Sequence, residues 1–125
     1  MATRDELREA LDEYVRQAQA NERVRRSLKG WNCVIQIETT DLPDTAFTMT
    51  ITNGEPSAIA HGLQGTPDLI VRGSSEDLTN IFWCDENPAS TYMQGAIQTH
   101  GSQEDVMRLD AMAMFIYLAA TQANS

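Results

Sequence analysis

Apolar residues recur at helical spacing over the first part of the chain. Glu6 follows Thr3 by three positions, which is the pattern of a capping box at a helix start. The apolar positions that follow share one helix face: Leu7, Ala10, Leu11, Tyr14, Val15 and Ala18. Val24 and Leu28 either continue this helix or form a second short one, and Gly30 ends it. We therefore predict an N-terminal helical segment over residues 3–29.

Alternation of apolar and polar residues replaces the helical spacing after Gly30. Residues 31–40 and 47–52 each place apolar side chains on one face of a strand, namely Cys33, Ile35 and Ile37, then Phe47, Met49 and Ile51. The Asn53-Gly54 pair is a tight-turn signal, so residues 55–60 return as a third, weaker strand antiparallel to the second. The predicted local topology is a meander.

The second half of the chain mixes strands with helices. Residues 68–72 predict a fourth strand, and Ser74 caps a helix whose apolar stripe contains Leu78, Ile81 and Phe82. The Asn87-Pro88 pair starts a short helix, because proline suits the first helical position. Residues 95–101 begin and end with glycine and alternate between them, which predicts a fifth strand.

A methionine-rich helix follows the fifth strand. Ser102 with Asp105 caps it, and its apolar face is unusually broad: Val106, Met107, Leu109, Met112, Ala113, Met114, Phe115, Ile116 and Ala120. Methionine adapts to irregular contents, so this face indicates an apolar cavity beside the helix, with ordinary core filling as the alternative. We predict one domain over residues 1–125 of the α+β class, with a five-stranded, mostly antiparallel sheet covered by helices on one side.

The net charge of −9 is unevenly distributed. Residues 1–29 hold seven basic and six acidic residues, whereas the remainder holds two basic and twelve acidic residues. An acidic body repels phosphate backbones and anionic membrane surfaces, which disfavours nucleic-acid binding. One basic cluster suits either docking on an acidic partner or headgroup, or a solvated helix face: Arg23, Arg25, Arg26 and Lys29.

Candidate catalytic and metal-binding groups are few. Cys33 and Cys84 lack metal-ligand spacing, and a charged N-terminus without a signal core predicts free thiols in the cytoplasm. His61 and His100 lack a third ligand at suitable spacing, so no metal site is predicted. The sequence contains no nucleophile elbow or phosphate-binding glycine loop, and no apolar run long enough to span a membrane. We predict no catalytic residue and no cofactor.

The order of these motifs resembles the sterol carrier protein 2 (SCP-2) sterol-binding domain family. The resemblance covers residues 28–118 and is clearest at residues 67–78 and 93–101. Both segments occur in the family's order, after an N-terminal helix and a meander and before a closing helix. Trp31 and the glycine of the tight turn also fall where the family has an aromatic strand start and a hairpin glycine.

The resemblance implies an apolar tunnel between sheet and helices that takes up fatty acyl chains, fatty acyl-CoA, sterols or other lipids. Carried over by position, the lipid-binding residues are Ile35, Phe47, Met49, Phe82, Met93, Ile97, Met112, Phe115 and Ile116. None of them would act chemically, so we expect non-enzymatic binding or carriage of an apolar lipid. One alternative is an accessory subunit that presents an apolar intermediate to a partner enzyme through the basic cluster. Another uses His61 or His100 as a general base.

Two departures from the family pattern narrow this expectation. Ala96, Gln98 and His100 stand where the family often has lysines on the outer face of the glycine strand, which disfavours an anionic headgroup such as CoA. Residues 122–125 also lack the peroxisomal address of many eukaryotic members. We therefore expect a cytoplasmic, prokaryotic-type member.

Overall fold

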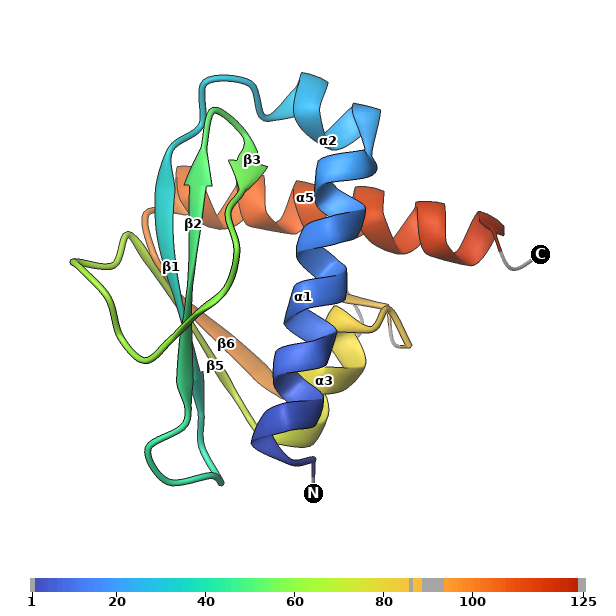
Figure 1. Ribbon diagram of the computed structural model, residues 1–125. Helices are drawn as coiled ribbons and strands as arrows, with labels where there is room; N and C mark the ends of the chain where they lie inside the picture. Colours follow the sequence, from blue (N-terminus) through green and yellow to red (C-terminus); the bar gives the residue numbers. More distant parts are fainter. Residues whose placement is uncertain (1, 86, 89–93, 124–125) are drawn as a thin grey trace.

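One mixed sheet with helices against one of its faces forms the protein (Figure 1). The computed structural model describes residues 2–85, 87–88 and 94–123. Its helices are α1 (Arg4–Ala20), α2 (Glu22–Ser27), α3 (Ser75–Phe82) and α5 (Gln103–Ala123). Its strands are β1 (Cys33–Thr39), β2 (Ala46–Thr52), β3 (Glu55–Pro56), β4 (Ala60–His61), β5 (Leu69–Gly73) and β6 (Ile97–Gly101). The predicted short helix at Asn87-Pro88 falls largely outside the described residues.

The sheet has the order β3-β2-β1-β5-β6, and β4 also pairs with β2. The central pair of β1 and β5 is parallel, and every other pairing in the described sheet is antiparallel. Asp68 starts the parallel pair, because its carboxylate accepts from the Val34 N–H at 2.9 Å while its own N–H donates to the Val34 carbonyl at 2.8 Å. The α+β class with a mostly antiparallel sheet is thus confirmed.

The third predicted strand, over residues 55–60, is divided in the structure. β3 and β4 are two residues each and pair with different parts of β2, which makes the sheet six-stranded. Pro56 has no N–H to donate to a ladder, and Ile59 between the two short strands is buried at 4% exposure. The chain therefore leaves the sheet edge to bury Ile59 and returns at Ala60.

The predicted helical segment over residues 3–29 is two helices. The Thr3 hydroxyl accepts from the Glu6 N–H at 3.1 Å and the Glu6 carboxylate accepts from the Thr3 N–H at 3.3 Å, which completes the predicted capping box. Asn21 ends α1 and caps α2, since its side-chain oxygen accepts from the Val24 N–H at 3.2 Å. The same side chain donates to the Phe115 carbonyl at 3.3 Å, which ties the break between α1 and α2 to α5.

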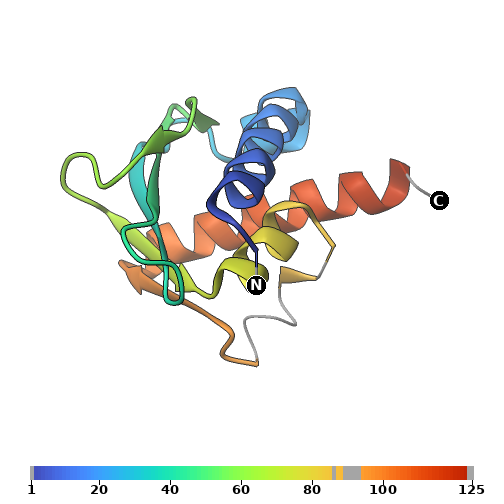
Figure 2. The ribbon, with the colours of Figure 1, turned by 60° about the horizontal axis from the view of Figure 1, so that its bottom comes forward.

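The core lies between the helices and one face of the sheet. Figures 1 and 2 show α1, α3 and α5 on the same side of the strands, with the end of α5 extending past the other helices. Register aligns alternate residues of neighbouring strands into rows on this face, such as Met49 beside Ile35 and Ile37 beside Val71. The largest fully buried side chains are Leu7, Leu11, Tyr14, Trp31, Ile35, Ile37, Phe47, Met49, Ile51, Leu69, Leu78 and Met112.

A polar loop covers part of the opposite face of the sheet. Thr48 is 3% exposed, and its hydroxyl donates to the Gly62 carbonyl at 2.7 Å and accepts from the Gln64 N–H at 3.0 Å. The Gln36 amide, also buried, donates to the Gly65 carbonyl at 3.4 Å. The middle of this face is therefore covered by a loop that hydrogen-bonds to the strands, and not by a helix.

Candidate functional site

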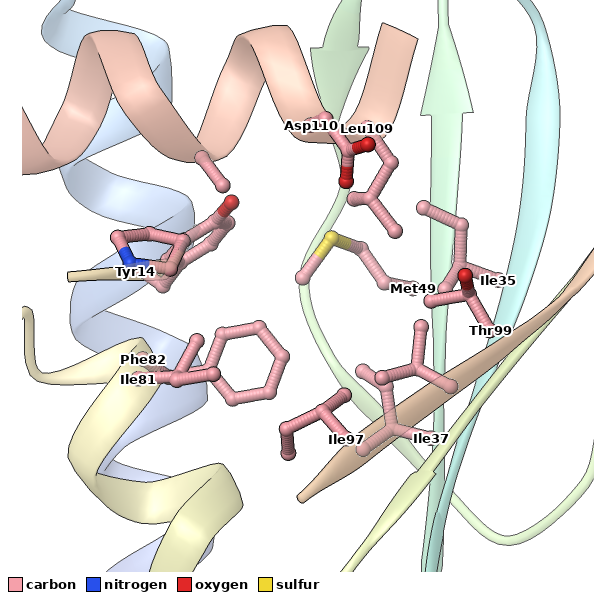
Figure 3. A pocket seen from close by; sticks show the side chains of 13 residues that line it. Tyr14, Ile35, Ile37, Met49, Ile81, Phe82, Ile97, Thr99, Leu109 and Asp110 are labelled. Carbon is pink, nitrogen blue, oxygen red and sulfur yellow. The ribbon is translucent and has the colours of Figure 1, made fainter. Parts of the chain in front are cut away.

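An apolar cavity lies between the helix-facing side of the sheet and the three long helices (Figure 3). The cavity measures about 530 Å³ when its open mouth is included. The volume that the centre of a water molecule could occupy is about 50 Å³. One water needs about 10–15 Å³ by the second measure, so the enclosed part holds a few waters and no long lipid. The cavity is lined by Tyr14, Ile35, Ile37, Met49, Val71, Ile81, Phe82, Pro88, Ile97, Thr99, Leu109, Asp110 and Ala113.

Strand alternation supplies the sheet wall of the cavity. Successive side chains of a strand point to opposite faces, so odd-numbered residues of β1, β2, β5 and β6 share the helix-facing side. Val71 stands opposite Thr99, and Gly73 opposite Ile97. A Cβ at Gly73 would come within 2.7 Å of the Ile97 Cδ1 atom. Ile97 therefore lies over Gly73, and the missing side chain at 73 gives it room at the cavity wall.

Side chains from α1, α3 and α5 form the opposite wall. The rings of Tyr14 and Phe82 meet edge to face, with centroids 4.9 Å apart. On α5 the wall consists of Leu109, Asp110 and Ala113, which lie within about one helical turn of one another. Ala113 is small, so α5 leaves space there where a larger side chain would fill it.

Three polar side chains interrupt the apolar lining. Tyr14 is buried, and burial raises the pKa of its phenol, with Cys84 and Asp110 adding to the shift. Asp110 is exposed on α5, yet its carboxyl is directed into the cavity (Figure 3), and partial burial raises its pKa. The Thr99 hydroxyl oxygen is buried and has no hydrogen-bond partner among the described residues. An unpaired buried hydroxyl is costly, so this atom is suited to a partner that enters from the cavity.

The structure brings four of the nine predicted lipid-binding residues to this cavity: Ile35, Met49, Phe82 and Ile97. Phe47, Met112 and Ile116 are fully buried in the core but do not line it. Phe115 is half-buried on α5 under the guanidinium of Arg23, whose central carbon is 5.0 Å from the ring centroid. Met93 lies outside the described residues. A lipid-binding role for all nine stays a prediction.

The sequence-based choice missed nine of the lining residues. Ile37 and Thr99 could have been found, because they share strand faces with Ile35 and Ile97, whereas Val71 lies on a strand from which no residue was chosen. Leu109 and Ala113 belong to the predicted apolar stripe of the last helix, yet the choice there fell on the larger Met112, Phe115 and Ile116. Asp110 carries no signal in the apolar pattern, since a single acid on a helix is most often solvated.

The basic cluster is partly engaged within the protein. Arg26 pairs with Glu22 at 2.8 Å, one helical turn away, and Arg23 stacks on Phe115. Arg25 and Lys29 are exposed. All four residues of the cluster are exposed, and Arg23 and Arg26 are the two that make these surface contacts.

Neither histidine lies at the cavity. His61 is exposed beside the start of α1 and meets the Phe47 ring edge-on, with centroids 5.7 Å apart. His100 is exposed on β6, where alternation directs it to the face opposite Thr99. Across the described residues, no three His, Cys, Asp or Glu side chains gather as a metal site, and no helix is long and apolar enough to cross a membrane.

Comparisons with known proteins agree with this fold. Residues 11–114 match the model of the SCP-2 sterol transfer family. A solved structure of a conserved hypothetical protein from Thermus thermophilus, described as possibly a sterol carrier protein, is 14% identical, with 91% of this chain and 85% of that chain covered and a TM-score of 0.66. The crystal structure of sterol carrier protein 2 is 12% identical over 89% of this chain and 93% of that one, with a TM-score of 0.63.

A third solved structure, the UbiJ-SCP2 ubiquinone synthesis protein, is 16% identical and has a TM-score of 0.57. The alignment covers 86% of this chain and 85% of that chain. Among the curated proteins, none matches this sequence. At these identities the structural matches establish the fold, while the family match rests on the sequence itself.

Proposed function

The chain belongs to the SCP-2 sterol transfer family, and we propose that it binds and carries an apolar lipid in the cavity between its sheet and its helices. Membership implies binding or transfer of an apolar lipid. The observation that carries the proposal for this chain is the lining: ten of the thirteen side chains are apolar, and they come from both layers of the fold.

Lipid uptake requires the two layers to separate. The enclosed space is about 50 Å³, which is too small for a long acyl chain. The wall contributed by α5 is the best candidate for the moving part, because Leu109 and Ala113 are only partly buried, whereas Ile35 and Met49 on the sheet are at most 1% exposed. A bound lipid would thus pack its apolar surface against the surface that α5 now covers.

Binding needs no covalent step. The cavity holds a tyrosine, a threonine and an aspartate, and neither histidine reaches it. Each buried methylene contributes about 0.8 kcal/mol, whereas association itself costs about 4 kcal/mol or more. We therefore expect net binding only for long chains, with affinity rising about fourfold per added methylene.

Free thiols at Cys33 and Cys84 are consistent with action in the cytoplasm.

Filling the cavity from α5 tests the proposal. Ala113→Leu places a larger side chain at the wall, and Ala119→Leu makes the same change at an exposed position of the same helix. We would titrate each protein with an uncharged fluorescent lipid, pyrene-dodecanoic acid methyl ester, and follow pyrene emission. Ala113→Leu is expected to lose at least about tenfold in affinity, and Ala119→Leu to match the parent. Absence of probe uptake by the parent, together with no lipid in native mass spectra of the purified protein, would refute the proposal.

A second candidate function is that of an accessory subunit. The UbiJ-SCP2 ubiquinone synthesis protein has a similar fold, and Arg25 and Lys29 are exposed basic groups on an otherwise acidic protein. We infer that such a subunit would hold an apolar intermediate for a partner enzyme. Reversal of both charges, Arg25→Glu with Lys29→Glu, should abolish cross-linking to a partner in the native host and leave probe uptake intact. Arg4→Glu is the control reversal on α1, and an unchanged cross-linking pattern in the double variant would exclude this role for the cluster.

A further inference from the structure

We propose that Asp110 selects the polar end of the bound lipid, favouring an uncharged hydrogen-bond donor such as the hydroxyl of a long-chain alcohol over a carboxylate. This inference rests on the proposed lipid-binding function and adds a ligand class to it. Asp110 is the one acidic residue among the thirteen that line the cavity, and the other walls around it are mainly apolar. An ionised carboxylate offers only acceptors, so its best ligand group is a donor.

No cation among the described residues neutralises Asp110. Arg108, two positions earlier on α5, pairs with Glu104 at 2.7 Å. The other ion pairs of the described chain join residues elsewhere, on α1, on α2 and between β1 and β5. A ligand headgroup at the cavity therefore meets a negative charge with no positive group beside it. Asp110 is exposed as a residue, and partial burial of its carboxyl raises its pKa.

Thr99 gives a second, independent indication of a polar ligand group. Its hydroxyl oxygen is buried at the sheet wall without a partner among the described residues, although a hydroxyl can both donate and accept. Native structures rarely leave such a group unpaired. A ligand hydroxyl can accept from Thr99 or donate to Asp110, whereas a ligand without polar atoms would satisfy neither.

Charge repulsion explains the discrimination against a carboxylate. Two like charges close together raise each other's free energy, and among the described residues no arginine or lysine lines the cavity to offset them. Beyond residue 29 the chain holds twelve acidic and two basic residues, which adds to the negative potential. An alcohol of the same chain length gains the same apolar burial without that repulsion.

A competition experiment separates the two proposals. The parent protein is loaded with the uncharged pyrene methyl ester, which is then displaced by 1-dodecanol or by dodecanoate at pH 7.5. We expect dodecanol to displace the probe at a concentration at least about tenfold lower. Desolvation alone also disfavours a carboxylate. The decisive quantity is therefore how far Asp110→Asn reduces the ratio of the two displacing concentrations, dodecanoate over dodecanol. We expect a reduction to about threefold or less, while Glu9→Gln, which removes the same charge from an exposed position of α1, keeps the parent's ratio.

Each outcome has one meaning. Displacement by dodecanoate at the same concentration as dodecanol would overturn the selectivity proposal while leaving lipid binding intact. An unchanged ratio in Asp110→Asn would overturn the role of Asp110. Failure of the parent to take up the probe at all would instead refute the proposed function. The parent's own ratio does not depend on the variant, so equal displacement by the two ligands would overturn the selectivity even if the variant folds poorly.

Discussion

The indole nitrogen of Trp31 donates a hydrogen bond to the Asp105 carboxylate at 2.9 Å, across 74 positions of sequence. Trp31 is 2% exposed and precedes β1, while Asp105 lies in the first turn of α5. The contact therefore joins the residues before β1 to the first turn of α5, the helix that lines one side of the cavity. Its partner group is charged, which makes it one of the stronger hydrogen bonds of the fold.

Replacing this indole should destabilise the protein markedly. Trp31→Phe removes the donor and leaves the carboxylate without it, so we expect the free energy of unfolding to fall by about 2–3 kcal/mol. Asp105→Asn keeps an oxygen acceptor for the indole and should lose about 1 kcal/mol. Urea unfolding at 25 °C measures both variants, and a larger loss for Asp105→Asn than for Trp31→Phe would contradict this account.

Two glycines of the sheet should respond differently to alanine. A Cβ at Gly101 would meet the Asp68 carbonyl oxygen at 2.6 Å and the Leu69 side chain closer still, whereas a Cβ at Gly73 would meet the end of the Ile97 side chain at 2.7 Å and the Ala96 carbonyl oxygen only at 3.1 Å. Backbone cannot yield as a side-chain end can. We expect Gly101→Ala to lose more than about 3 kcal/mol and Gly73→Ala about 1–2 kcal/mol, by urea unfolding. Equal losses would show that Ile97 is held as rigidly as the backbone.

The Asp41 carboxylate should contribute stability that depends on pH. It accepts from the Ser75 N–H at 2.8 Å and from the Ser75 hydroxyl at 2.9 Å, and the first of these bonds chiefly lowers the pKa of Asp41. A lowered pKa in the folded state means that the contribution is complete above the ordinary value of about 3.9 and is lost as the pH falls through the folded value.

Asp41→Asn is therefore expected to be less stable than the parent between pH 5 and 8, with the difference shrinking below about pH 4. Unfolding free energies across this range provide the measurement. Asp44→Asn, at an exposed turn position where asparagine tolerates the positive φ, serves as the control and should follow the parent at every pH. A constant difference for Asp41→Asn down to pH 2 would rule out the carboxylate as its source.

Both thiols should be unreactive in the folded protein. Burial raises the pKa of Cys33 to about 12 and that of Cys84 to about 11, with nearby acids adding to the shifts. Only the thiolate attacks a disulfide reagent, so Ellman's reagent at pH 8 should modify the native protein far more slowly than the urea-unfolded one. Rapid modification of Cys84 in the native state would indicate that the end of α3 opens.

The same shifts predict a loss of stability at alkaline pH. Unfolded cysteine titrates near 8.5, so between about pH 8.5 and 11 the folded state retains protons that the unfolded state has lost. The free energy of unfolding should therefore fall as the pH rises through that window. Cys84→Ala should fall less steeply than the parent from pH 8 to 10, and identical slopes would exclude a contribution from this thiol.

Much of the fold could be predicted because its local signals agree with its packing. Alternation identified which side of β1, β2 and β6 faces the helices, and the hydroxyls of Thr3, Ser74 and Ser102 accept from the helix N–H groups that the cap patterns indicated. The break at Asn21 was readable in principle, since asparagine is a favoured cap, but the apolar spacing continues across it.

The cavity was harder to predict because it depends on how the last helix is rotated against the sheet. An apolar face as broad as that of α5 fits several rotations. In the structure Met112 and Ile116 fill the core, and the smaller Ala113 with Leu109 borders the empty space. Large side chains remove space and small ones leave it, so the choice of the largest apolar residues pointed to the filled side of the helix. Asp110 could be identified as a lining residue only once that rotation was known.

The parallel pairing of β1 with β5 has a consequence for the order of folding. β1 and β2 are neighbours in sequence and can pair early, whereas the bond between Val34 and Asp68 closes a loop of 34 positions. The cavity takes Ile35 and Met49 from the early pair and Val71, Ile97 and Thr99 from the strands that dock after loop closure. A chain still being synthesised or only half folded thus has no complete cavity, because the last strand and helix must be in place to form its remaining walls.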